Sequence, residues 1–192
     1  MTKVRKHTTI MVKDSITPMK QNSATPRKLF IPLVILALLG FLLFSLTSKT
    51  PAPDVTFTTI TGKTISMAEL KGKMVLVNFW ATDCPGCIAE MPKLIETYNQ
   101  YHQQGFEMVA VAMSYDPPSQ VLNYTSKRQV PFPVMHDSLG EVASRFGNVN
   151  LTPTTFIVDK EGRIVRKTIG EMDFAALHDL LDKELGKPGK QS

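Results

Sequence analysis

The chain has 192 residues, enough for one or two domains, and its formal net charge is +5. Residues 1–28 carry seven lysines and arginines against one aspartate, a balance of +6, so residues 29–192 sum to −1. The basic character therefore belongs to a short tail, and we predict no nucleic-acid partner for the rest of the chain.

The first predicted element is an apolar helix over residues 29–48, a segment without a charged side chain. Twenty helical residues extend about 30 Å, which matches the hydrocarbon core of a bilayer. A cleaved signal peptide has a shorter apolar region of about 7 to 15 residues, and the stretch SLTSKTPA offers only a poor cleavage site. A cleaved signal and a buried soluble helix are the alternatives. We favour an uncleaved anchor, because an all-apolar helix would otherwise need more core around it than this chain can supply.

The predicted anchor divides the chain into five parts. Residues 1–28 form a basic tail, which the positive-inside rule places in the cytoplasm. The transmembrane segment 29–48 is followed by a Pro-containing linker over 49–54, one compact domain over 55–186 and a frayed end over 187–192. The expected location is the inner (cytoplasmic) membrane, crossed once, with the domain on the periplasmic or extracytoplasmic side.

Within the domain, the pattern of apolar residues predicts alternating strands and helices. The run MVLVNFW over 74–80 is continuous and rich in branched side chains, as in a central strand covered on both faces. Apolar residues then recur at spacings of three and four, which predicts an amphipathic helix over 85–104. The same helical periodicity predicts a closing helix over 172–185.

Shorter elements complete the predicted domain. A hairpin is predicted ahead of the central strand, over 55–66. Behind the first helix we predict a strand over 106–113, a helix over 117–129, a short strand over 131–137, a short helix over 139–147 and a hairpin over 154–170. This order indicates an α/β fold with a mixed sheet and helices on both faces.

Both cysteines of the chain, Cys84 and Cys87, lie where the central strand gives way to the helix. A structural zinc site would need four ligands, and the four histidines stand far apart in the sequence. A purely structural disulfide would close a ring too small to restrain the unfolded chain much. A redox dithiol fits better, because the free N–H groups and the dipole of the helix stabilise a thiolate on the first sulfur. Cys84 would attack a client disulfide, and Cys87 would resolve the mixed disulfide.

Three stretches of the chain resemble a known family: VNFWATDCPGCIAEMPKL, the strand VAVAM with a further helix and strand behind it, and NLTPTTFIVDKEGRI. In these stretches the chain is similar to the thioredoxin superfamily and, within it, to the membrane-anchored TlpA/ResA-like thiol–disulfide oxidoreductases. The similarity covers residues 55–186. It implies a thioredoxin-like mixed sheet with an N-terminal hairpin and a central helix–strand insertion, a redox-active disulfide between Cys84 and Cys87, and a cis peptide bond between Thr152 and Pro153. We predict no cofactor and no bound metal.

The resemblance also assigns residues around the cysteines. It places Thr152 and Pro153 beside the sulfurs, where an extended client chain could bind. Glu90 matches an active-site glutamate of ResA-like proteins and is the expected proton acceptor, with a solvated helix glutamate as the alternative. Asn78 stands where cytoplasmic thioredoxins have a buried aspartate, and an asparagine cannot take a proton, so we expect a hydrogen-bonded core amide there.

Client binding is also expected from Trp80, Asp83 and Pro85. Most relatives carry a tryptophan where this chain has Asp83, so Trp80 is the only tryptophan left and client docking should differ. The charge of Asp83 would disfavour a thiolate on Cys84. The alternative is that Asp83 points into water and only caps the following helix.

These residues predict a protein-disulfide reductase that acts on oxidised, cysteine-containing clients, with cytochrome c maturation or a similar process as the setting. Reduction is favoured because the compartment already holds strong oxidants, and relatives receive electrons from a transmembrane thiol carrier, which is the expected donor. A copper-binding and delivery module is the alternative, with Met135 and His136 as extra ligands, although such modules use Cys-x-x-x-Cys. A peroxidase would need proline at position 77 and threonine at position 81, where this chain has Val77 and Ala81.

Overall fold

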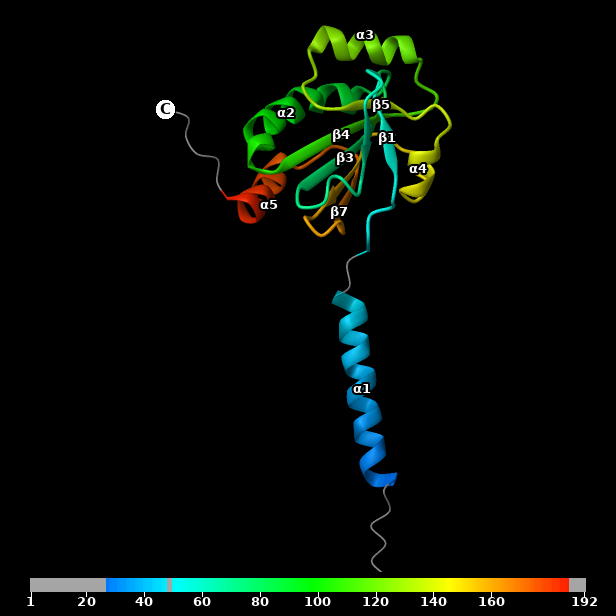
Figure 1. Ribbon diagram of the computed structural model, residues 1–192, viewed down its shortest axis with the longest axis vertical. Coiled ribbons are helices and arrows are strands. Elements are labelled where there is room, and N and C mark those ends of the chain that lie inside the picture. The colour runs from blue at the N-terminus through cyan, green and yellow to red at the C-terminus, as the bar shows by residue number, and fades with distance from the viewer. Residues whose placement is uncertain (1–26, 48–49, 187–192) are drawn as a thin grey trace, which may run out of the picture. The chain divides into compact units, whose positions relative to one another are not determined.

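The structure, a computed structural model, describes residues 27–47 and 50–186, which belong to two compact units, Met1–Ser48 and Lys49–Ser192. In the first unit, helix α1 runs from Arg27 to Thr47 (Figure 1). Within the described part of the chain, none of the helices combines the length and the apolar character that crossing a bilayer requires. The anchor over 29–48 stays a prediction, and the frayed end and nearly all of the basic tail lie outside the described residues.

The second unit is built on a five-stranded mixed sheet with the strand order β5-β4-β3-β6-β7. At its centre, β3 (Met74–Trp80) pairs in parallel with β4 (Phe106–Ala112) and antiparallel with β6 (Thr154–Val158). The outer strands are β5 (Val134–His136), parallel to β4, and β7 (Ile164–Ile169), antiparallel to β6. The sheet is therefore mixed, as predicted.

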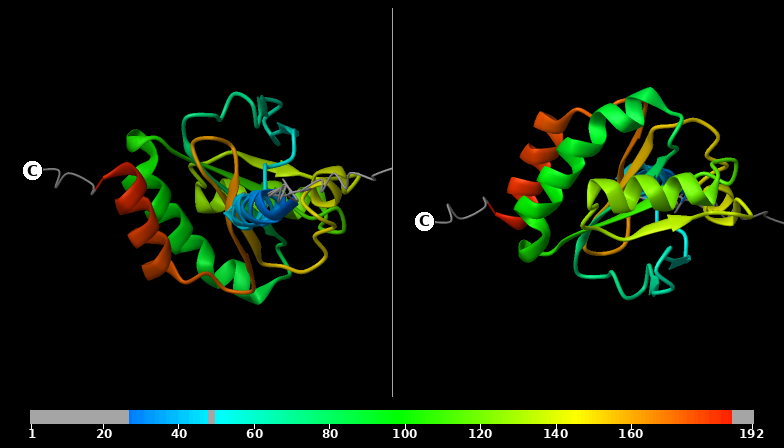
Figure 2. Two further views of the ribbon diagram at one scale, coloured as in Figure 1. Left: turned by 90° about the horizontal axis from the view of Figure 1, so that it is seen from below. Right: turned by 90° about the horizontal axis from the view of Figure 1, so that it is seen from above.

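Successive side chains of each strand point to opposite faces of the sheet. Other elements pack on both of these faces. On one face, alternate residues of β3 such as Met74, Leu76 and Trp80 join a core with three helices. Those helices are α2 (Pro85–Tyr101), α3 (Pro118–Arg128) and α5 (Phe174–Leu185). Figure 2 shows α2 and α5 side by side on this face. On the other face, Val77 and Phe79 pack with helix α4 (Glu141–Arg145) and with the separate hairpin of β1 (Thr56–Thr58) and β2 (Thr64–Ser66).

The strands and helices predicted for the domain are all present, with small differences at their ends. The largest concerns the first amphipathic helix, whose α-helical part ends at Tyr101 and continues as the 3₁₀ turn η1 (His102–Gln104). Gly105 ends this turn with a positive φ of 96°, a conformation that glycine adopts without a steric penalty. The helix–strand insertion is confirmed as α3 and β5.

Candidate active site

The two cysteines form a disulfide at the carboxyl end of β3, where helix α2 begins. Cys84 is the N-cap of α2, with extended backbone angles, and its Sγ accepts a hydrogen bond of 3.2 Å from the backbone N–H of Cys87. Pro85 is exposed and occupies the start of the helix, where its fixed φ fits and its missing N–H costs nothing. The local sequence thus holds one sulfur at the positive end of a helix.

The two sulfur-bearing residues differ in exposure. Cys84 is half-buried, whereas Cys87 is only 1% exposed and belongs to the core beneath α2. A client protein can therefore reach Cys84 but not Cys87. This asymmetry matches the predicted roles of an attacking and a resolving thiol.

The loop ahead of β6 lies against this helix end. The peptide bond between Thr152 and Pro153 is cis, as the resemblance implied. A Cβ built on Gly86 would lie 3.6 Å from Cδ of Pro153 and 3.5 Å from Oε1 of Glu171. Gly86 therefore sits between the proline loop and the loop that precedes α5, and Thr152 and Pro153 lie next to the dipeptide between the cysteines.

Glu90 is buried one helical turn after Cys87, with only 5% of its surface exposed, so the solvated alternative is wrong. Its Oε1 accepts a hydrogen bond of 3.2 Å from Nδ2 of Asn78, and its Oε2 accepts one of 3.3 Å from the backbone N–H of Met172. Burial raises the pKa of Glu90, although both hydrogen bonds act in the opposite direction. Glu90 is thus a buried carboxyl group, one helical turn after Cys87, with an increased affinity for a proton.

Asn78 is fully buried on β3. Its amide cannot accept a proton from a thiol, and it donates a hydrogen bond to Glu90 instead. Its Nδ2 also donates a hydrogen bond of 2.9 Å to Oγ1 of Thr155 on the neighbouring strand β6. Its Oδ1 is buried without a hydrogen-bond partner in the described structure. The prediction of a core amide at this position is confirmed.

The surroundings of Trp80 and Asp83 differ from those that the sequence predicts. Trp80 is fully buried and its ring packs on that of Tyr124, with the centroids 5.3 Å apart. The prediction that Trp80 binds clients is therefore wrong, because its place on β3 directs the ring into the core under α2. Asp83 is exposed next to Cys84, and since Cys84 itself occupies the N-cap, the capping alternative for Asp83 is wrong as well.

Sequence reasoning missed the loop between β4 and α3, which lies at the same edge of the sheet. Here the buried carboxylate of Asp116 accepts hydrogen bonds from the backbone N–H of Thr82, at 2.7 Å, and from the Thr82 hydroxyl. Beside it, the hydroxyl of the exposed Tyr115 lies 3.4 Å from Oγ1 of Thr152. A signal was present, because the carboxyl ends of neighbouring parallel strands meet at one edge, and the letters SYDPP directly follow the second strand.

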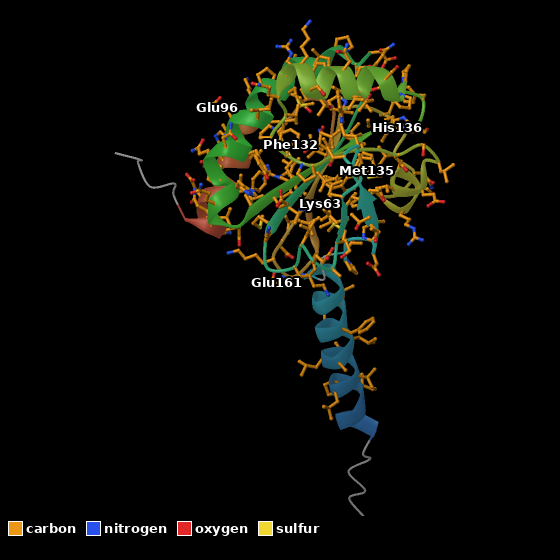
Figure 3. The ribbon with its side chains drawn as sticks, turned by 45° about the horizontal axis from the view of Figure 1, so that its top comes forward. Lys63, Glu96, Phe132, Met135, His136 and Glu161 are labelled. Carbon is orange, nitrogen blue, oxygen red and sulfur yellow. A yellow bond between two sulfur atoms is a disulfide. The ribbon has the colours of Figure 1, made fainter. Side chains whose placement is uncertain are left out.

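Met135 and His136, the residues considered as extra copper ligands, make contacts of other kinds in the structure. Figure 3 shows Met135 and His136 as neighbours on β5. Met135 is buried in the core on the hairpin side of the sheet, and His136 makes a hydrogen bond of 2.8 Å through Nε2 with the backbone oxygen of Asp116. Among the described residues, no group of three or more His, Cys, Asp or Glu side chains is arranged to hold a metal ion.

Comparison with known proteins gives consistent matches. Residues 47–181 match the model of the Redoxin family. The chain is 33% identical over 178 residues to the thiol–disulfide oxidoreductase ResA of Bacillus subtilis, covering 86% of this chain and 97% of ResA. A crystal structure of a thioredoxin-family thiol:disulfide interchange protein from Chlorobium tepidum is 31% identical, with a TM-score of 0.66 over 73% of this chain and 99% of that one. StoA from Bacillus subtilis is 27% identical, with a TM-score of 0.57 over 66% of this chain and 96% of StoA.

Proposed function

We propose, from its membership of the Redoxin family, that the chain reduces disulfides in extracytoplasmic client proteins. The chain is a ResA-like thiol–disulfide oxidoreductase of the thioredoxin superfamily. The observation that carries the proposal is the pairing of a reachable Cys84 at a helix N-terminus with a shielded Cys87 and the buried Glu90. The direction, reduction rather than oxidation, is supported by the resemblance to the TlpA/ResA-like branch, whose members receive electrons from a transmembrane thiol carrier.

In the reduced protein, the thiolate of Cys84 attacks one sulfur of the client disulfide. The client S–S bond breaks, a mixed disulfide forms and the first client thiolate leaves and takes up a proton. Cys87 then gives its proton to Glu90 and attacks Sγ of Cys84, which releases the second client thiolate. The client gains two electrons and the protein is left with the Cys84–Cys87 disulfide, the state that the structure describes.

A full cycle needs a donor that returns two electrons to this disulfide. We assign that role to a transmembrane thiol carrier, and cysteine-containing proteins such as apocytochrome c are the proposed clients. Residues 29–48, with twenty uncharged and mostly apolar residues, would anchor the domain to the outer side of the cytoplasmic membrane, close to such a donor.

The reduction potential of the full-length protein tests the proposed direction. Equilibration of the purified protein with glutathione or dithiothreitol buffers, followed by quantification of the Cys84–Cys87 disulfide, gives this value. A reductase should lie near the potential of thioredoxin, about −270 mV. A potential near −120 mV, which is typical of a strong oxidant, would reverse the assignment.

A further inference from the structure

Tyr115 places an exposed aromatic ring beside the proposed client-binding loop. It lies on the loop between β4 and α3 (Figure 1), and 57% of its surface is exposed. Its hydroxyl is 3.4 Å from Oγ1 of Thr152, the residue that precedes Pro153. Tyrosine has an apolar ring and a polar hydroxyl, so a ring exposed beside a functional loop offers a contact surface to a partner.

The neighbour of Tyr115, Asp116, holds this loop against the segment that precedes Cys84. The Asp116 carboxylate is 2% exposed and binds both the backbone N–H and the hydroxyl of Thr82, which lies two residues before Cys84. The backbone oxygen of Asp116 is in turn hydrogen-bonded to His136. These bonds tie the loop that carries Tyr115 to the segment that leads into the active cysteine.

A second exposed apolar side chain comes directly before Thr152 in the chain. Leu151 directly precedes Thr152 and is 58% exposed. Thr152 continues into Pro153, which packs against Gly86 between the two cysteines. A continuous path of contacts and covalent bonds therefore links the ring of Tyr115 and the side chain of Leu151 to the N-terminus of α2.

Two acidic side chains lie at the same helix end. Asp83 is exposed directly before Cys84, and the exposed Glu171 lies beside Gly86. An acidic client segment would be repelled by these carboxylates, whereas an apolar segment of neutral or positive charge would not. Tyrosine is also among the residues that contribute most to binding at protein interfaces.

We propose that Tyr115 and Leu151 form an apolar docking surface for the client residue next to the attacked cysteine, and that the protein thereby prefers clients with an aromatic or large aliphatic side chain at that position in a non-acidic segment. This inference rests on the proposed function, because it names the class of client that the same site selects. Tyr115 contacts the client and does not take part in electron transfer.

The test uses the reduced full-length protein and three disulfide-bonded peptides that differ only in the residue next to cysteine: phenylalanine, serine or aspartate. The second-order rate constants for reduction of the peptides by the wild-type protein should fall in the order phenylalanine, serine, aspartate. Tyr115→Ala should lower the phenylalanine-to-serine ratio about tenfold, and Tyr115→Phe should keep it, because the ring remains. Leu122→Ala is the matched control, since Leu122 is also exposed, at 51%, but lies on the surface of α3, and it should leave the ratio unchanged.

Two outcomes would overturn the inference: a wild-type protein that shows no preference among the peptides, or a Tyr115→Ala variant that keeps the wild-type ratio. Failure of the proposed function has a different signature. A wild-type protein that cannot reduce hydroxyethyl disulfide, which has no side chain to dock, would show that the thiol chemistry itself was assigned wrongly.

Discussion

Glu90 is a carboxyl group enclosed by helix α2, strand β3 and the loop ahead of α5. Burial is the largest influence on its pKa and raises it, and the carboxylate of Glu171 raises it further. The hydrogen bonds from Met172 and Asn78 lower the pKa but do not cancel the effect of burial. A group with this balance can take a proton from a nearby thiol and return it to solvent, which is the use we assign to it.

We expect Glu90→Gln to slow the resolution of the mixed disulfide about 100-fold, because glutamine can accept hydrogen bonds but cannot take the proton of Cys87. In the wild-type protein, the rate of this step should rise with pH as Glu90 loses its proton, with a midpoint above the ordinary value of 4.5. Single-turnover reduction of a client, followed at a series of pH values, measures the rate of this resolution step. Glu96→Gln, an exposed glutamate of the same helix that Figure 3 labels, is the control. If the rate of resolution in Glu90→Gln kept the pH dependence of the wild-type protein, Glu90 would not be the proton acceptor for Cys87.

Protein stability gives an independent check of the same residue. Because folding raises the pKa of Glu90, the folded chain binds this proton more tightly than the unfolded chain does. The free energy of unfolding contributed by Glu90 is therefore lost as pH rises through the folded-state pKa. Urea unfolding measures the free energy of unfolding of the wild-type protein and of Glu90→Gln. As pH rises, this free energy should fall in the wild-type protein relative to the variant.

Asp83 is the other residue with a separate prediction, because its charge is exposed directly before Cys84. A negative charge close to a thiolate disfavours it, and the interaction weakens with added salt. Asp83→Asn should therefore lower the pKa of the Cys84 thiol, and the difference from the wild-type protein should shrink at high salt. The ultraviolet absorbance of the thiolate, followed against pH, measures this. Identical titration curves for the two proteins would show that the electrostatic account of Asp83 is wrong.

At the scale of the elements, local patterns predicted which segments are strands and helices but not how side chains meet between them. The continuous run MVLVNFW identified β3, yet an unbroken apolar run has no alternation, so it cannot tell which face Trp80 points to. The structure places Trp80 on the same face as Asn78 and α2, in the core. The position of Cys84 was predictable, because a strand followed by an amphipathic helix fixes it at the helix N-terminus.

Contacts between distant loops could not be derived from spacing. The bond between Thr82 and Asp116 joins residues 34 positions apart, and that between Tyr115 and Thr152 joins residues 37 apart. Such contacts depend on the register of β3 with β4 and β6, which tertiary packing sets. The docking surface therefore became visible only in three dimensions, although the residues that compose it are plain in the sequence.

At the scale of the whole molecule, the proposed role requires the thioredoxin-like domain to lie outside the cytoplasm. We predict that a reporter fused after residue 192 is active only on the extracytoplasmic side, and that the full-length protein stays in the membrane during alkaline carbonate extraction. The reason is the uncharged segment 29–48, with the excess of positive charge on its amino side. A shortened product released in soluble form would instead indicate a cleaved signal peptide.

The division of labour between the two sulfurs is the central claim, and trapping of mixed disulfides tests it most directly. Cys87→Ser and Cys84→Ser variants of the full-length protein would be expressed in cells, and adducts that disappear on treatment with dithiothreitol would be counted for each. Cys84 is reachable at the start of α2 whereas Cys87 is buried, so Cys87→Ser should accumulate client adducts and Cys84→Ser should not. Equal trapping by the two variants, or trapping by Cys84→Ser alone, would contradict the account.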